Sequence, residues 1–249
     1  MGSFSAFRSL PILHRDPLKS GCDSSTFQTS FVFSMKFIFC LFFFTIIFGC
    51  QKEDLNKQIL AVQDSVIITK PEIDIPKTNQ KAKEALEFCK AKNFNTDFCI
   101  LIDMSLHSGV KRFFVYDFKK NEISQQYLVG HGCGTSSWSV DDTKENPSFS
   151  NEDNSHLSSL GKYKLGARGY SNWGVHVKYL MHGLEETNSN ALKRIIVFHS
   201  WEMMSDDEVY PKGSPEGWGC PTVSNNAFKE IDPMLKNSKK PVLMWIYTI

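Results

Sequence analysis

The chain has 249 residues, of which 41% are hydrophobic and 13% aromatic, so it can bury a full core in one large domain. Its 28 basic and 27 acidic residues leave a formal net charge of +1, and they are spread without long blocks of one sign. This balance argues against binding to nucleic acid or another polyanion.

Residues 35–49 have the pattern of an export signal. Lys36 precedes an almost entirely apolar run at residues 37–48, and a small residue follows before Cys50. The run is shorter than the ~20 residues needed to span a bilayer, which makes a transmembrane helix the weaker interpretation. The sequence Ile-Phe-Gly-Cys that ends at Cys50 also resembles a bacterial lipobox. It implies lipidation of Cys50 and a membrane as partner.

Residues 1–34 show neither helical nor strand periodicity, and Met35 is a natural start, so we interpret them as an upstream extension that is not native to the protein. Residues 50–81 are mostly polar, and Pro71 and Pro76 are expected to stop regular structure, which predicts a tether. The expected location is the cell envelope. The lipid anchor would lie in the outer membrane, with the domain facing the periplasm or the cell surface.

Residues 82–249 are predicted to form one mainly β (α+β) domain with a helix near each end. The apolar spacing of residues 82–93 indicates the first helix, and residues 222–235 indicate a second one that Pro233 interrupts. Segments typical of strands lie between turn signals, at residues 98–104, 111–118, 123–131, 162–169, 172–180, 193–201 and 242–249. The polar segment 132–160 is long for a loop inside a compact domain, which indicates a functional role.

Two further cysteines, Cys89 and Cys99, flank a polar connector that could bring the end of a helix beside the start of a strand. In an exported protein this pair could form a disulfide. The alternative is two small buried apolar side chains. Neither thiol is a candidate for catalysis.

Cys220 and His199 are the candidate nucleophile and general base. Acyl transfer by cysteine needs the thiolate and a partner that takes its proton. Cys220 stands at the tip of the turn GWGCP, ahead of the second predicted helix, whose N-terminus would lower the pKa of the thiol. Gly217 and Gly219 permit a sharp turn and can direct N–H groups at an oxyanion. His199 ends a buried strand, and Ser200 could fix its tautomer by a hydrogen bond. The alternatives are a structural thiol and a strand-end histidine.

The segments IIVFHSW and GWGCPTVS resemble the active-site signature of the murein L,D-transpeptidase catalytic domain family, the YkuD-like cysteine transpeptidases. The resemblance continues through PSFSN, HLSSLGKYKLG, LMHGLE and IDMSLHSGVKRFFVYD, and it covers about residues 82–249. It implies a YkuD-like β-sandwich with flanking short helices, and peptidoglycan stem peptides as partners.

Cys220 would attack the L-centre carbonyl of the stem's diamino acid, release D-alanine and form a thioester. An amine of a second stem would then make a 3-3 cross-link, and water would make the reaction an L,D-carboxypeptidase. The alternative is a catalytically weak envelope lipoprotein that binds stem peptides.

Many members of the wider superfamily have Ser-His-Gly-Cys where this chain has Gly-Trp-Gly-Cys. Because Trp218 cannot accept a proton, the role of the base falls on His199. The indole of Trp218 either lines the substrate groove or simply packs, and Trp201 is a further candidate for substrate binding. His131 matches a family position and is either a polar group of the cleft or a solvent-facing loop residue. No zinc-binding spacing of Cys and His occurs, so we expect no metal and no cofactor. The oligomeric state stays open.

Overall fold

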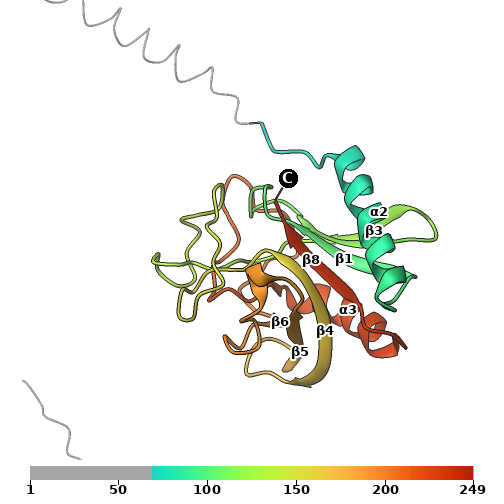
Figure 1. Ribbon diagram of the computed structural model, residues 1–249. Coiled ribbons are helices and arrows are strands. Elements are labelled where there is room, and N and C mark those ends of the chain that lie inside the picture. Colours follow the sequence, from blue (N-terminus) through green and yellow to red (C-terminus); the bar gives the residue numbers. More distant parts are fainter. Residues whose placement is uncertain (1–68, 249) are drawn as a thin grey trace, which may run out of the picture. The chain divides into compact units, whose positions relative to one another are not determined.

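The computed structural model describes residues 69–248 (Figure 1). The segments that we interpret as an upstream extension, an export signal and most of a tether lie outside the described residues, as does Cys50. The described part contains the helices α2 (Ile75–Ala91) and α3 (Asn225–Asn237) and the short 3-10 helix η1 (Glu186–Asn188). Its strands are β1 (Phe98–Asp103), β2 (Phe113–Asp117), β3 (Glu122–Tyr127), β4 (Gly161–Tyr170), β5 (Val177–Gly183), β6 (Val197–Ser200), β7 (Thr222–Val223) and β8 (Leu243–Tyr247). Neither of the two α-helices between residues 69 and 248 has the length and apolar character of a membrane span.

The eight strands form one mixed sheet with the order β3-β2-β1-β8-β4-β5-β6-β7. The pairs β1–β8 and β6–β7 are parallel, and the other neighbours are antiparallel. The two edges of the sheet meet, because Gly130, just after β3, forms a bridge with Thr222 of β7. This contact gives the sheet the character of a barrel or sandwich and leaves little free edge. The predicted mainly β domain with two helices is confirmed.

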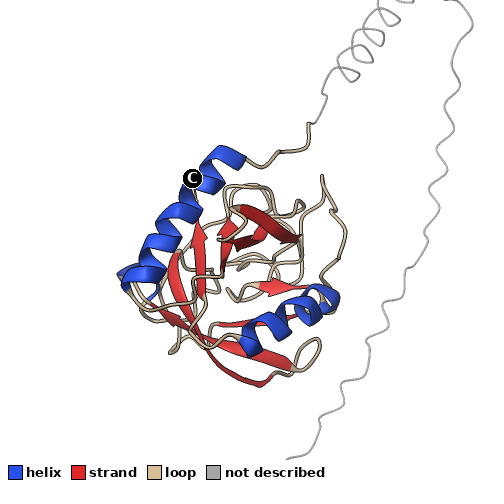
Figure 2. Cartoon of the chain, turned by 90° about the vertical axis from the view of Figure 1, so that its right-hand side faces the viewer, coloured by secondary structure: helices blue, strands red, loops and turns tan. Residues whose placement is uncertain are grey.

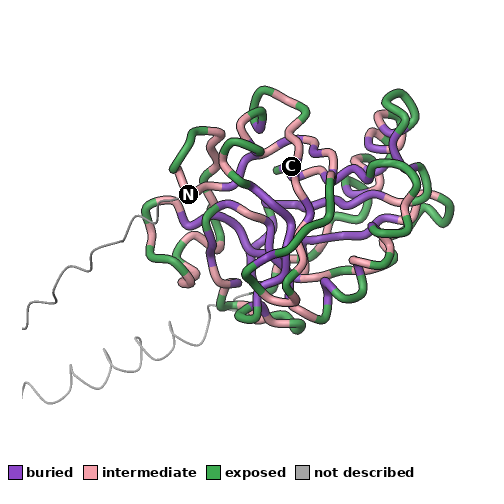
Figure 3. Tube along the Cα trace, turned by 90° about the horizontal axis from the view of Figure 1, so that it is seen from below, coloured by how far each residue is buried: buried purple, intermediate pink, exposed green. Residues whose placement is uncertain are grey.

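The two helices lie on opposite sides of the sheet (Figure 2). Helix α3 contacts β6, where Phe228 lies 5.1 Å from Phe198 between ring centroids. Helix α2 contacts β1 and β8 instead. The most buried residues therefore follow the central strands (Figure 3). Side chains alternate along a strand, so Val197 and His199, the two neighbours of Phe198, point away from α3. Helix α2 packs on β1 and β8 and does not cover this second face at β6.

Helix α2 begins at Ile75, before the predicted start at residue 82, and so occupies part of the predicted tether. Asp74 caps it by accepting a hydrogen bond from the backbone N–H of Lys77 at 3.0 Å. Pro76 lies in the first turn, where an N–H group has no helical partner. Pro76 thus starts a helix, and the prediction that it stops regular structure was wrong.

Helix α3 continues through Pro233 to Asn237, whereas the sequence predicted an interruption there. Ile231 and Leu235, on either side of the proline, are both buried in the core. Their packing offsets the backbone hydrogen bond that a proline inside a helix removes.

Cys89 of α2 and Cys99 of β1 are free thiols, so the predicted disulfide is not present in the structure. Both belong to the apolar cluster beneath α2. Burial raises the pKa of Cys89 to about 12 and that of Cys99 as well. The two residues follow the alternative interpretation, as small buried apolar side chains.

Candidate active site

Cys220 stands in a loop that leads into β7 and is held from both sides. On one side, the N–H of Gly217 donates to the carbonyl of His131 at 2.7 Å, and the N–H of Cys133 donates to the carbonyl of Gly217 at 2.8 Å. On the other side, the N–H of Val197 donates to Cys220 Sγ at 3.4 Å. The loop is therefore fixed between the segment after β3 and strand β6.

The position of Gly219 imposes two requirements on the backbone that only glycine meets without strain. Its φ is +94°, and a Cβ atom there would lie only 2.5 Å from the carbonyl oxygen of Leu157. Its own carbonyl accepts a hydrogen bond from Ser158 Oγ at 3.2 Å. Within residues 69–248 no acceptor takes the N–H of Gly219 or of Cys220. Both amides are thus available to an oxyanion beside the thiol.

His199 is the penultimate residue of β6, and its side chain is buried with a defined tautomer. Its Nδ1 donates to the backbone carbonyl of Ser200 at 2.9 Å, which leaves Nε2 as the proton acceptor. The hydroxyl of Ser200 instead accepts from the N–H of Val175 at 3.0 Å. Ser200 therefore fixes the tautomer through its main chain and not through its side chain. Burial lowers the pKa of His199, so the imidazole is neutral and able to take a proton.

The thiol of Cys220 does not have the lowered pKa that the sequence predicted. Burial raises its pKa, and the Val197 N–H and the charges of Arg194 and Lys178 oppose this only in part. The expected helix effect fails because α3 begins at Asn225, beyond β7. The sulfur lies 3.8 Å from the carbonyl oxygen of Ile195. The hydrogen bonds of the described residues do not include one between Cys220 and His199, so proton transfer requires the thiol to turn toward Nε2.

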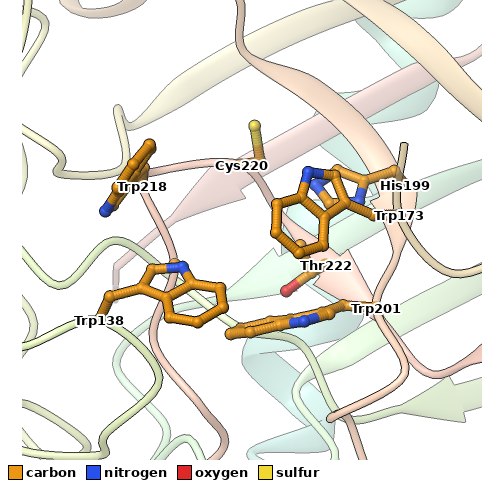
Figure 4. Close-up of a pocket in the computed structure, with 8 residues that line it drawn as sticks. Trp138, Trp173, His199, Trp201, Trp218, Cys220 and Thr222 are labelled. Atoms are coloured by element: carbon orange, nitrogen blue, oxygen red, sulfur yellow. The ribbon is translucent and has the colours of Figure 1, made fainter. Parts of the chain in front are cut away.

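Both residues line a pocket of about 120 Å³ whose walls are mainly aromatic (Figure 4). Four of the chain's five tryptophans face it, namely Trp138, Trp173, Trp201 and Trp218. Trp201 is 3% exposed, whereas Trp218 is 61% exposed and stacks on His156. Trp138 lies 5.0 Å from Trp201 and 5.9 Å from Trp173 between ring centroids. The indoles form an apolar surface next to the thiol.

The sequence did not single out Trp138 and Trp173 for this pocket. Trp138 lies in the long polar segment 132–160, where an isolated tryptophan could have served as a signal. Trp173 stands in the turn before β5, and it reaches the pocket only because β5 pairs with β6.

His131 does not line the pocket, so its predicted role in the cleft and the solvent-facing alternative were both wrong. It is fully buried, with Nδ1 at 2.8 Å from Arg112 Nη2 and Nε2 at 2.8 Å from Thr143 Oγ1. Burial, followed by the charge of Arg112, lowers the pKa of His131 to about 2. Its ring is therefore a neutral support beneath the backbone that holds Gly217.

Two buried ionisable side chains accompany His131, and no sequence motif singled out either of them. Glu216 begins the loop of residues 216–221 that carries Cys220, which we call the nucleophile loop. It accepts hydrogen bonds from the N–H and the Oγ1 of Thr143 at 2.6 and 3.0 Å. Arg112 donates to the carbonyl of Leu106 at 2.8 Å, and burial lowers its pKa to about 9. These residues fix the base of the nucleophile loop through a polar network closed to solvent.

Arg194 anchors the polar segment on the other side of Cys220. Its Nη1 donates to the Ser150 carbonyl and to Ser159 Oγ at 2.8 and 2.6 Å. Its Nη2 donates to the Leu157 carbonyl at 2.5 Å and to Ser155 Oγ at 3.1 Å. The carbonyl of Leu157 is the group that approaches Gly219, so part of the long segment positions the nucleophile loop.

The sequence matches the L,D-transpeptidase catalytic domain family over residues 69–247. None of the curated proteins compared with the chain matches it. Similar solved structures are the helical cell shape determining protein Pgp2 of Campylobacter jejuni, with 12% identity and a TM-score of 0.40 over 61% of this chain and 47% of that one, and an L,D-transpeptidase of Xylanimonas cellulosilytica, with 11% identity and a TM-score of 0.33 over 60% of each chain. The protein Bd1075 of Bdellovibrio bacteriovorus has 18% identity and a TM-score of 0.35 over 62% of this chain and 49% of that one. The chain thus spans about half the length of Pgp2 and Bd1075.

Proposed function

Because the chain belongs to the L,D-transpeptidase catalytic domain family, we propose that it transfers the acyl group of a peptidoglycan stem peptide through a thioester on Cys220. One observation carries the proposal. Cys220 and the neutral His199 share the wall of one aromatic pocket, and the N–H groups of Gly219 and Cys220 are unused within the described part of the chain.

In the first half of the reaction, His199 Nε2 takes the proton of the thiol, and the sulfur attacks the L-centre carbonyl of the diamino acid in a tetrapeptide stem. The oxyanion accepts hydrogen bonds from the Gly219 and Cys220 amides, each worth about 3 kcal/mol in the transition state. The tetrahedral intermediate collapses with cleavage of the C–N bond, and the imidazolium of His199 returns its proton to the leaving D-alanine.

In the second half, a side-chain amine of another stem attacks the thioester and His199 takes a proton from that amine. The C–S bond then breaks, and the imidazolium of His199 returns the proton to the Cys220 thiolate. This sequence makes a 3-3 cross-link. With water as the nucleophile, the product is a tripeptide and the net reaction is that of an L,D-carboxypeptidase.

The test is incubation of the purified full chain with tetrapeptide muropeptides, followed by separation and mass spectrometry of the products. We expect release of D-alanine and formation of 3-3 dimers, and neither with Cys220→Ala. Formation of tripeptide without 3-3 dimers would show that the protein acts as an L,D-carboxypeptidase. Unchanged tetrapeptide would contradict acyl transfer in either form.

A second candidate function is stem-peptide binding without efficient catalysis. It is supported by the raised pKa of the Cys220 thiol. It is also supported by the hydrogen bond that Sγ accepts from the N–H of Val197, because within residues 69–248 Sγ makes no hydrogen bond with His199. Calorimetric titration with tetrapeptide separates the two functions. Binding that survives in Cys220→Ala, together with no release of D-alanine by the wild type, favours the binding protein.

We also propose that the protein is lipid-anchored in the cell envelope through Cys50, on the basis of the signal-like residues 35–49. Incorporation of a labelled fatty acid into the wild type and not into Cys50→Ser would support the anchor. Protease treatment of intact cells would then separate a periplasmic domain, which is protected, from a domain on the cell surface.

A further inference from the structure

Lys178 lies beside His199 on the face of the sheet that carries the nucleophile. Lys178 of β5 is the register partner of His199 of β6, and opposite residues of an antiparallel pair have Cβ atoms about 5 Å apart. Their neighbours Tyr179 and Phe198 both pack on α3. Lys178 and His199 therefore point to the other side, where Cys220 contacts the start of β6.

The ammonium group of Lys178 is free to bind a ligand. Its side chain is partly exposed, and within residues 69–248 it takes part in no ion pair and donates no side-chain hydrogen bond. Arg194, the other cation whose charge acts on Cys220, is committed to four hydrogen bonds with the polar segment. Of the two cations whose charges act on Cys220, Lys178 is therefore the one that is free to meet an anionic group of a substrate.

The charge of Lys178 reaches both reacting side chains. Burial is the largest influence on each pKa, lowering that of His199 and raising that of Cys220, and the Lys178 charge lowers both. Lys178 does not itself line the pocket, but its register partner His199 does, so the ammonium lies at the border of the site where the donor stem would be bound.

We propose that Lys178 binds a carboxylate of the donor stem and thereby selects stems that end in a free carboxyl group. The inference rests on the proposed function, which puts the scissile carbonyl at Cys220. The terminal D-alanine carboxylate lies one residue beyond that carbonyl, a span of about 3.5 Å. A lysine next to the base can reach it and form a charge-assisted hydrogen bond. The free carboxylate upstream of the diamino acid has the same chemistry and is a second source.

The test compares three tetrapeptide donors on the purified full chain: the native donor, one with an amidated C-terminus, and one with an amidated upstream carboxylate. We expect wild type to have about tenfold higher kcat/KM for the native donor than for the C-terminally amidated one, mainly through KM. Lys178→Met should abolish this preference, and Lys178→Arg should retain it. Lys164→Met is the matched control, because Lys164 lies on the same face opposite His182 and should leave the preference intact.

The preference ratio is the decisive readout, because loss of the Lys178 charge also changes His199 and Cys220 and so slows every donor alike. A Lys178-dependent preference against the upstream-amidated donor assigns that carboxylate as the ligand. An equal loss on all three donors, or a preference that survives in Lys178→Met, overturns the inference. Calorimetric titration of Cys220→Ala with the same peptides measures the preference as a ratio of dissociation constants, in a variant that cannot form the thioester. If no acyl-enzyme forms, the proposed function is refuted. The calorimetric ratio still decides whether Lys178 binds the carboxylate.

Discussion

Replacing Gly219 with alanine would place a methyl group against the backbone that supports the nucleophile loop. Gly219 has a φ of +94°, and the new Cβ would lie 2.5 Å from the carbonyl oxygen of Leu157. Gly217, two residues earlier in the same loop, has open space at the Cβ position and no positive φ. Gly219→Ala and Gly217→Ala thus form a matched pair that differs in the predicted strain.

The expected magnitude follows from these two features. A positive φ costs an alanine about 1–2 kcal/mol, and the overlap with a backbone oxygen adds about 1 kcal/mol. For a domain of this size, a loss of about 2–3 kcal/mol lowers Tm by roughly 5–10 °C. Relief of the overlap moves Cys220 by about 1 Å, and a misplacement of that size costs about 100-fold in rate.

Scanning calorimetry measures Tm, and mass spectrometry of the intact protein measures the rate of acylation by a tetrapeptide donor. Gly217→Ala should stay within about 2 °C and threefold of wild type, because its methyl group meets no atom. If Gly219→Ala matched Gly217→Ala in both Tm and rate, the tight approach of Leu157 to the nucleophile loop would be refuted.

Four other changes test separate parts of the site. His199→Ala should reduce single-turnover acylation by at least about 100-fold and Ser200→Ala by less than about tenfold, since the Ser200 carbonyl orients the ring; equal losses would contradict this. Arg194→Met removes four hydrogen bonds, so limited proteolysis should cleave residues 150–157 faster than in wild type, and unchanged protection would argue against the anchor. Burial holds the pKa of His131 at about 2, so the unfolded state binds the extra proton and the free energy of unfolding should fall as the pH drops below 6.5, by up to about 1.4 kcal/mol per pH unit. Urea unfolding of His131→Gln should depend less steeply on pH, and an unchanged slope would count against the buried neutral ring. Iodoacetamide should alkylate Cys220 with a midpoint above pH 9, because burial raises the pKa of the thiol, whereas a midpoint near pH 7 would indicate an activated resting thiolate.

The sequence predicted those parts of the molecule that depend on local pattern. Alternating apolar residues placed most of the strands, and the two aromatic-rich motifs placed Cys220, His199, Trp201 and Trp218 in one site. Strand β7 was missed because two residues are too few for a period to appear. The start of α2 was missed because Pro76 was interpreted as a breaker of structure, although a proline in the first turn of a helix is favourable.

The remaining features depend on pairing between distant segments, which one sequence does not reveal. Arg112, His131 and Glu216 meet because the chain after β3 lies against the nucleophile loop. Lys178 meets His199 through the register of β5 and β6, and a shift by one residue would turn Lys178 to the opposite face. The raised pKa of Cys220 likewise reflects burial in the folded protein, which the glycine-rich loop did not suggest.

The mass of the intact protein after incubation with a tetrapeptide stem tests the central claim most directly. Thioester formation on Cys220 predicts a mass increase equal to the donor minus D-alanine, located on the peptide that contains Cys220 and absent from Cys220→Ala. An unmodified protein, with all the D-alanine still in the donor, would contradict the claim that this pocket performs acyl transfer.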